Sequence, residues 1–413
     1  MVGLHSASLV RLASFLAAFG AARVLGFDIS RNDNVAAYWG QNSYGAAGGA
    51  QSLWQQPIDY YCQDNSVDMF PIAFLNVFFG AGGLPSLDLA NICSTSGDPV
   101  FDGTQLPNCQ FLASAIQTCQ SKGKAVTLSL GGATGAAGFS SDAQATAFAD
   151  TIWNLFLGGS SSTRPFGSAV LDGIDLDIEG GSTAYFTSFV NQLRSHMNGA
   201  SKQYYITAAP QCPFPDAYLG SVINAVGFDA ILVQFYNNYC GLNNYANPND
   251  WNFGTWDNWA KTTSPNKNVK IFIGAPASST AAGSGYVPID QLTTILQQTK
   301  AQYSSFGGVM YWDISQAYAN NRFDVAVKSA VSGGASAPGN PTTTTTPTTA
   351  PTTTTTTTSP TTVPTSGGSC SSANAWVSNV AYNGGDQVVY NGHLWTAKWW
   401  SYGDVPGGKF LTG

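Results

Sequence analysis

The sequence predicts a (β/α)8 barrel, joined by a Thr/Pro-rich linker to a small all-β module. Eight short runs rich in Val, Ile and aromatic residues recur along the chain, as buried parallel strands require. The segments between them carry apolar residues at helical spacing. Strand–helix alternation over roughly 300 residues is typical of this barrel. An open doubly wound sheet is the alternative, but no Gly-x-Gly-x-x-Gly follows the first run to support a dinucleotide fold.

The expected elements follow in chain order. The eight strands are expected at residues 35–39, 72–77, 125–130, 173–178, 204–208, 230–235, 269–273 and 307–312. The clearest helices are expected at residues 143–157, 184–197 and 288–303. In such a barrel the chemistry lies at the carboxyl ends of the strands.

Composition narrows the class of partner. Of 413 residues only 9% are charged, while 44% are hydrophobic and 13% aromatic. The formal net charge of −7 argues against nucleic acid and anionic membranes as partners. Many aromatic and few charged side chains suit a neutral polymer with sugar-like faces. We expect a monomer that needs no metal and no cofactor.

The first 26 residues are predicted to be a secretory signal. Arg11 precedes an apolar run at 12–19, and small residues follow up to Gly26. The run is too short to span a bilayer. Six of the seven cysteines lie between 62 and 240 and could form three disulfides in an oxidising compartment. Zinc is the weaker alternative, because no close cysteine pair exists. We expect a secreted, extracellular protein, with cell-wall association as a further option.

The run from Asp172 to Glu179 is the most informative stretch. Asp175, Asp177 and Glu179 alternate with aliphatic residues, so a strand places all three carboxyls on one face. Such a face is costly to bury without protons or partners. A calcium site or a solvated edge strand is the alternative, but calcium loops prefer flexible turns. We therefore predict an active site, with Asp172, which has the opposite parity, in a structural role.

The other strand ends supply polar and aromatic residues, which describe a sugar-binding cleft. The predicted substrate contacts are Tyr38, Gln41, Asn76, Gly132, Gln211, Gln234, Asn237 and Trp312. Asp313 is the nearest further carboxyl. Glycosidases usually need a second carboxylate across the scissile bond, and these strand ends offer none.

The carboxyl pattern therefore predicts a substrate that brings its own nucleophile. Asp177 and Glu179 lie roughly 6.6 Å apart at Cα, so they can share a proton. A neighbouring carboxylate raises the pKa of Glu179, which then acts as general acid. A 2-acetamido carbonyl would attack C1, while Asp177 holds the acetamido N–H. Tyr236 would donate its hydroxyl to the acetamido oxygen, and Trp312 would form the floor under the sugar. The cleaved position must then carry N-acetylglucosamine.

The end of the chain changes character. Residues 332–369 are dominated by Thr and Pro and are expected to form a solvated linker between residues 27–331 and 370–413. The last segment is aromatic, and residues 388–397 are predicted to form a β-hairpin around Asn391-Gly392. Tyr382, Trp399 and Trp400 are candidates for stacking on sugars; the alternative is that all rings form a mini-core. The tether favours a binding module.

Four motifs in residues 30–330 resemble those of family 18 glycoside hydrolases. They are Asp172-x-x-Asp175-x-Asp177-x-Glu179, Ser129-x-Gly131-Gly132, Gln234-Phe235-Tyr236-Asn237 and Gly308-Val309-Met310-Tyr311-Trp312. Two further segments resemble the class III, hevamine-like chitinases: Tyr38-Trp39-Gly40-Gln41-Asn42 and Ala208-Ala209-Pro210-Gln211-Cys212-Pro213-Phe214-Pro215-Asp216. The resemblance implies an endo-acting, retaining chitinase that acts on chitin and N-acetylglucosamine oligosaccharides. It implies Glu179 as proton donor, assisted by Asp175, Asp177 and Tyr236. It also implies the pairs Cys62–Cys119, Cys93–Cys109 and Cys212–Cys240.

Residues 370–413 resemble the chitin-binding modules of carbohydrate-binding families 5 and 12, with Trp399-Trp400 at the position of their exposed rings. Those modules usually continue to another Trp and often a Cys, so we expect a truncated module in which Cys370 lacks a partner. Two other functions share the barrel motifs. One is an endo-β-N-acetylglucosaminidase acting on glycoproteins, and the other is an inactive lectin or inhibitor. The second is disfavoured because the acid and its assisting Asp are both present.

Overall fold

A computed structural model of the chain describes residues 26–133, 137–333, 373–377, 381–382, 387–396, 401–402 and 405–406. The predicted signal segment, except Gly26, and nearly all of the predicted linker lie outside the described residues. Trp399 and Trp400 also lie outside them, as does the side chain of Tyr382.

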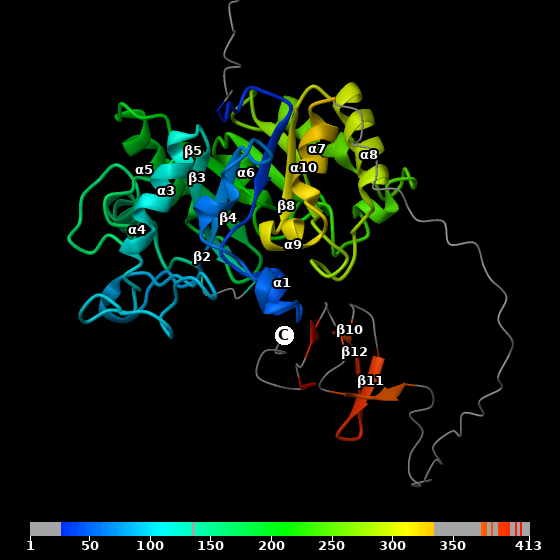
Figure 1. The fold of residues 1–413 in the computed structure, drawn as a ribbon, viewed down its shortest axis with the longest axis horizontal. Coiled ribbons are helices and arrows are strands. Elements are labelled where there is room, and N and C mark those ends of the chain that lie inside the picture. Colours follow the sequence, from blue (N-terminus) through cyan, green and yellow to red (C-terminus); the bar gives the residue numbers. More distant parts are fainter. Residues whose placement is uncertain are drawn as a thin grey trace, which may run out of the picture.

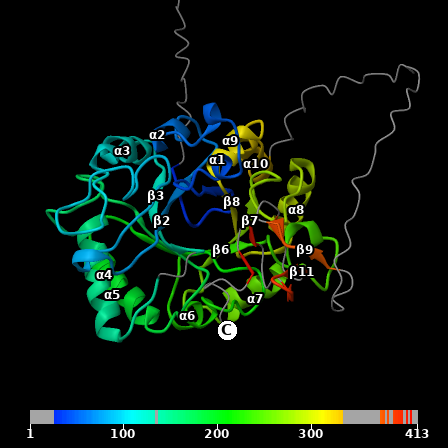
Figure 2. The same cartoon turned by 90° about the horizontal axis from the view of Figure 1, so that it is seen from below.

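Eight parallel strands close into a barrel, in which β1 pairs with both β2 and β8 (Figure 2). The strands are β1 Asn34–Ala37, β2 Met69–Leu75, β3 Ala125–Gly132, β4 Gly173–Ile178, β5 Tyr205–Ala208, β6 Ala230–Gln234, β7 Lys270–Pro276 and β8 Phe306–Trp312. Each predicted strand overlaps one of these, so the barrel is confirmed and the open sheet is wrong.

The α-helices lie outside the ring of strands (Figures 1 and 2). Within the described ranges they are α1 Ser43–Ala46, α2 Ile58–Tyr61, α3 Ala113–Ser121, α4 Asp142–Phe156, α5 Phe186–Asn198, α6 Gly220–Ala225, α7 Phe253–Thr262, α8 Ile289–Gln302, α9 Ile314–Ala319 and α10 Phe323–Val331. The start of α4 shows why one helix begins where it does. The Ser141 side chain accepts from the Gln144 N–H, and the Gln144 side chain accepts from the Ser140 N–H.

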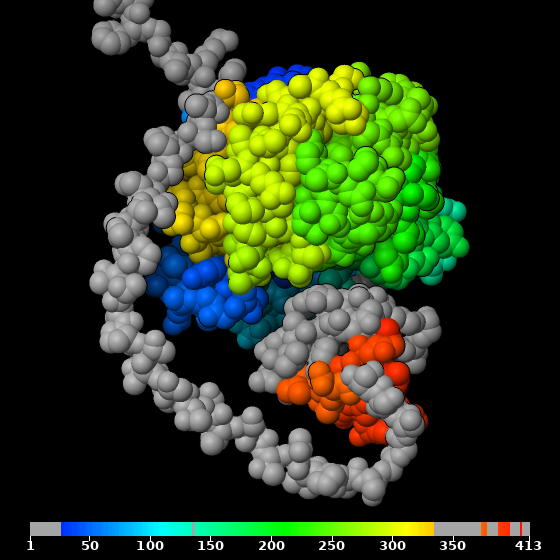
Figure 3. Space-filling model, turned by 90° about the vertical axis from the view of Figure 1, so that its right-hand side faces the viewer, coloured from blue at the N-terminus to red at the C-terminus, as the bar shows by residue number. Residues whose placement is uncertain are grey.

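Two apolar layers hold the barrel together. The larger layer fills the space between strands and helices and includes Ile174, Leu176 and Ile178 of β4. The smaller layer fills the barrel interior, where small residues such as Ala36 and Ala230 leave room for Phe272 and Met310. The opposite faces of β4 are therefore aliphatic outside and acidic inside. Figure 3 shows the segment from α7 to α10, in green to yellow, covering one outer face as a continuous wall.

Three disulfides fasten the outside of the barrel. They are Cys62–Cys119, Cys93–Cys109 and Cys212–Cys240, the pairs that the resemblance implied. The third joins the segment after β5 to the segment after β6. β5 pairs with β4, the strand that carries the acidic residues, and β6 pairs with β5. In the part of the chain that the structure describes, no helix combines the length and apolarity needed to cross a membrane.

Short strands are described near the end of the chain. They are β9 Asn374–Ala375, β10 Ala381–Tyr382, β11 Gln387–Tyr390, β12 His393–Thr396 and β13 Ser401–Tyr402. β11 and β12 pair antiparallel around Asn391 and Gly392, whose φ angles are 51° and 77°. Positive φ at both positions is what a two-residue Asn-Gly turn requires, so the predicted hairpin is present.

Candidate active site

The carboxyls of β4 enter the barrel at the carboxyl ends of its strands. Asp175 is fully buried and Asp177 is 3% exposed, while Glu179 follows the last residue of β4 and is partly exposed. Asp175 lies between Ser129 of β3 and Thr207 of β5 in the register of the sheet. The alternation predicted from the sequence therefore produces a column of three acids that ends at the barrel mouth.

Asp175 accepts three short hydrogen bonds from hydroxyl groups. The donors are Ser129 at 2.6 Å, Thr207 at 2.7 Å and Tyr38 at 2.7 Å. Burial raises the pKa of Asp175, and the three hydroxyl donors oppose that rise. Tyr38 thus binds a carboxyl of the site itself, which accounts for its buried hydroxyl.

Asp177 and Glu179 hydrogen bond to each other and share the amide of Gln234. The Gln234 Nε2 lies 2.9 Å from Asp177 Oδ1, 3.2 Å from Glu179 Oε1 and 3.0 Å from the Ala209 carbonyl. Burial raises the pKa of Asp177 well above its usual range, and the charges of Glu179 and Asp175 raise it further.

The pKa of Glu179 has a different balance of causes. Burial raises it, hydrogen bonds with Gln234 and Asp177 lower it, and the charge of Asp216 raises it. The pKa of Glu179 is therefore raised, the direction expected from the sequence, with burial as its largest cause. Burial raises the pKa of both carboxyls, so the pair favours holding a proton.

Aromatic side chains line the mouth beside the acid pair. Trp312 is partly exposed at the end of β8, stacks on Phe74 at 5.8 Å and is tilted to Tyr38 at 5.5 Å. Tyr236 is 7% exposed, and burial together with the charges of Asp177, Glu179 and Asp175 raises the pKa of its hydroxyl well above the usual range. Tyr236 therefore stays a hydrogen-bond donor, and Trp312 offers a ring face to a ligand.

Two glycines let the backbone of β3 approach the site. Gly131 has a φ of 109°, and a Cβ there would lie 2.6 Å from the Asp177 carbonyl oxygen. Gly132 has a φ of 75°, and a Cβ there would lie 2.9 Å from the Phe74 ring. Any side chain would push β3 away from β4 or displace Phe74. The predicted contact Gly132 is thus a spacing residue beneath an aromatic ring.

Other predicted contacts lie near the mouth but bind the protein. The Gln41 amide donates to the carbonyls of Ala73 and Asp88 at 3.0 and 2.9 Å. Asn237 accepts from the Ser284 N–H, and Gln211 accepts from the Asn238 amide. Within the described ranges, Asn76 makes no hydrogen bond with the protein and is partly exposed, so its amide is open to a ligand.

Two further carboxyls near the mouth are committed to the backbone. Asp313 is fully buried and caps α9, accepting from Gln316 and Ser43 N–H groups at 3.0 Å and from the Ser315 hydroxyl at 2.6 Å. Asp216 was missed as a site residue, although its charge raises the pKa of both Asp177 and Glu179. Ser129 and Thr207 were also missed as site residues. Their signal is parity, because each is an inward position on a strand beside β4.

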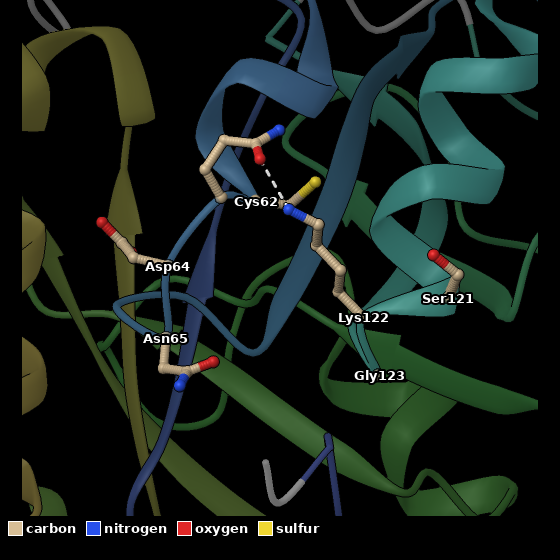
Figure 4. Close-up of a pocket in the computed structure, with 7 residues that line it drawn as sticks. Cys62, Asp64, Asn65, Ser121, Lys122 and Gly123 are labelled. Carbon is tan, nitrogen blue, oxygen red and sulfur yellow. Dashed lines mark hydrogen bonds between the residues drawn. The ribbon is translucent and has the colours of Figure 1, made fainter.

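The opposite end of the barrel holds a separate hollow. A cavity of about 490 Å³ is lined by Cys62, Gln63, Asp64, Asn65, Ser121, Lys122 and Gly123, which precede β2 and β3 (Figure 4). There Lys122 Nζ donates to the Gln63 side chain at 2.6 Å. The acid pair lies at the other ends of the strands, so this cavity is not the candidate site. Among the described residues, no cluster of three or more His, Cys, Asp or Glu is arranged to hold a metal ion.

A closed parallel barrel with a carboxyl pair and a ring face at its carboxyl-terminal mouth defines the class of barrel glycosidases. Within that class, the chain belongs to the glycosyl hydrolases family 18, whose model matches residues 34–405.

Individual relatives support this membership. Chitinase 2 of Rhizopus oligosporus is 53% identical over 307 residues, covering 74% of this chain and 54% of that protein. Endochitinase 33 of Trichoderma harzianum is 44% identical over 336 residues, covering 78% of this chain and 99% of that protein. The crystal structure of ICChI chitinase from Ipomoea carnea is similar with a TM-score of 0.57 and 35% identity, covering 73% of this chain and 99% of that chain. The chain spans about half the length of several curated relatives, Chitinase 2 among them.

Proposed function

We propose that the protein is an endo-chitinase that hydrolyses β-1,4 linkages between N-acetylglucosamine units of chitin. The observation that carries the proposal is the commitment of the carboxyls around Glu179. Asp313 caps a helix and Asp216 accepts three backbone N–H groups, so neither is free to act as a nucleophile across the scissile bond. A substrate with its own 2-acetamido nucleophile fits this arrangement, and the relatives named as chitinases support chitin as its source.

The reaction starts from the proton shared by Asp177 and Glu179. When Asp177 turns to accept the acetamido N–H of the substrate, it leaves that proton on Glu179. The acetamido carbonyl oxygen then attacks C1, the bond from C1 to the leaving oxygen breaks, and Glu179 protonates that oxygen. The ring so formed carries a positive charge, which the Asp177 carboxylate stabilises. Tyr236 donates its hydroxyl to the acetamido oxygen and orients it.

The second step restores the enzyme. Glu179, now ionised, removes a proton from water, and the water oxygen attacks C1 and reopens the acetamido group. Two inversions at C1 leave the β configuration of the substrate unchanged. Trp312 supports the sugar ring on its exposed face, and the open amide of Asn76 is a further sugar contact.

The test compares wild type with Glu179→Gln on soluble N-acetylglucosamine oligomers. The amide has the shape of the acid but cannot donate this proton, so turnover should fall by about 10²–10⁴-fold while oligomer binding persists. Early products of the wild type should be β-anomers by NMR. Appreciable activity in the variant, or an early α-anomer, would contradict the mechanism. A parallel assay on a high-mannose glycoprotein separates chitinase from endo-β-N-acetylglucosaminidase activity.

We also propose that the protein is secreted and carries a separate chitin-binding module. The three disulfides support an oxidising compartment. The hairpin of β11 and β12 supports a small β module, and Trp376 contacts Tyr390 edge to face at 5.2 Å within it. The domains proposed are a signal at residues 1–26, a catalytic barrel at 27–331, a linker at 332–369 and the module at 370–413.

A further inference from the structure

Asp216 lies in the segment between β5 and α6 and is 6% exposed. Its carboxyl accepts three backbone N–H groups of its own segment. These are Gln211 at 3.0 Å on Oδ2, and Tyr218 at 3.0 Å and Leu219 at 2.6 Å on Oδ1. The carboxyl therefore connects both ends of the loop and holds the backbone of Gln211 in place.

That loop is paired with the residue that bridges the acid pair. The Gln234 N–H donates to the Pro210 carbonyl at 2.8 Å, and the Gln234 carbonyl accepts from the Cys212 N–H at 3.2 Å. Gln211 lies opposite Gln234 in this parallel bridge. Since the Gln234 amide reaches both Asp177 and Glu179, a continuous set of hydrogen bonds runs from Asp216 to the acid pair.

The charge of Asp216 acts on the same pair. Its three donors are amide N–H groups, which favour an ionised carboxylate although burial raises the pKa of Asp216. Other titratable groups face the pair from each side: Asp175 on β4, Tyr38 directly after β1 and Tyr236 after β6. In the described part of the chain, no Lys, Arg or His forms an ion pair with any of these four carboxyls.

We propose that Asp216 is a positioning residue, which holds Gln234 against the acid pair and whose negative charge keeps the shared proton on that pair. The proposal rests on the proposed function, because the proton concerned is the one that Glu179 transfers. A carboxylate nearby makes loss of that proton less favourable, so it extends activity to higher pH.

The experiment measures kcat/KM for the soluble tetramer of N-acetylglucosamine across pH in wild type, Asp216→Asn and Asp257→Asn. Asp257 is the control: it is 5% exposed and also accepts three hydrogen bonds, from Lys261, with which it forms an ion pair, and twice from Ser305. Ser305 directly precedes β8, so Asp257 lies at the amino end of that strand, away from the acid pair. Asp216→Asn should move the high-pH limb of kcat/KM to lower pH by about half a unit or more. Asp257→Asn should lower the melting temperature and leave the limb unmoved.

A third variant, Asp216→Glu, keeps the charge. The high-pH limb of its kcat/KM profile should stay at the wild-type position even if kcat falls. If Asp216→Asn does not fold, the position of this limb in Asp216→Glu is the test. An unmoved limb in folded Asp216→Asn, or a limb moved equally in Asp216→Glu, would overturn the proposal. Wild-type protein that fails to cleave the tetramer would instead overturn the proposed function, so the two failures are distinct.

Discussion

Replacing Thr207 with Val removes one of the three hydroxyl donors to Asp175 and keeps the shape of the side chain. The lost bond is short, at 2.7 Å, and its acceptor is fully buried. A hydrogen bond to a charged group contributes about 1.5–3 kcal/mol, and no water can replace the donor at this depth. In a barrel of about 300 residues, whose unfolding entropy is about 0.6 kcal/mol per kelvin, that loss lowers the melting temperature by about 2–5 °C.

Thr127→Val is the matched control for this prediction. Thr127 is also a fully buried threonine of a barrel strand, but within the described residues its hydroxyl has no hydrogen-bond partner. Removing an unpaired buried hydroxyl should leave stability unchanged or raise it. Thermal unfolding of both variants beside wild type measures the difference. If Thr127→Val and Thr207→Val lose the same stability, the loss comes from packing and the reasoning about Asp175 is refuted.

Two further predictions concern the acid pair and the end of the chain. Asp177→Asn should stabilise the fold more at pH 8 than at pH 4, measured by melting temperature. The folded protein raises the pKa of Asp177, so ionisation there costs stability as pH rises above the unfolded value of about 4, and the amide removes that cost; a gain equal at both pH values would contradict this. Deleting residues 334–413 should weaken adsorption to insoluble chitin and spare hydrolysis of soluble oligomers, and unchanged adsorption would show that this segment is not the anchor.

The strands could be predicted where hydrophobicity is continuous, and less well where proline interrupts it. β4 was predicted at its observed bounds, whereas β2 begins at Met69, three residues before the predicted start. Pro71 argues against a strand in the sequence. In the barrel it pairs with Thr127 of β3, while β1 meets this part of β2 through Ala36 opposite Met69 and a bridge from Trp39 to Ile72. Few residues pair between β1 and β2, so the backbone N–H that Pro71 lacks is not needed on that side.

The site residues on β4 itself could be predicted from the sequence, whereas those contributed by other strands and loops were harder to predict. Parity alone places Asp175, Asp177 and Glu179 on one face. The partners of those acids come from other strands, so Thr207 is visible only once the register of β5 against β4 is known. Asp216 follows its strand by a loop, and no periodicity predicts that such a loop folds back on its own carboxyl. Gln234 was predicted as a sugar contact because the sequence does not reveal which acceptors its amide reaches.

Aspartates at the two ends of the barrel have different partners, and this difference explains why the acids of β4 can hold a proton. Asp68, Asp172 and Asp229 each directly precede a strand, and each forms an ion pair: with Lys328, Lys202 and Arg194 at 2.6, 2.9 and 2.9 Å. At the carboxyl ends of the strands, Asp175 accepts hydrogen bonds from hydroxyl groups, and Asp177 accepts one from an amide and contacts a second carboxyl. Burial beside another carboxylate favours protonation, as the raised pKa of Asp177 shows. Asp172 directly precedes β4 and Asp175 lies within it, three residues further along the chain, yet the end of the barrel that each faces decides whether it anchors the fold or belongs to the proton-holding site.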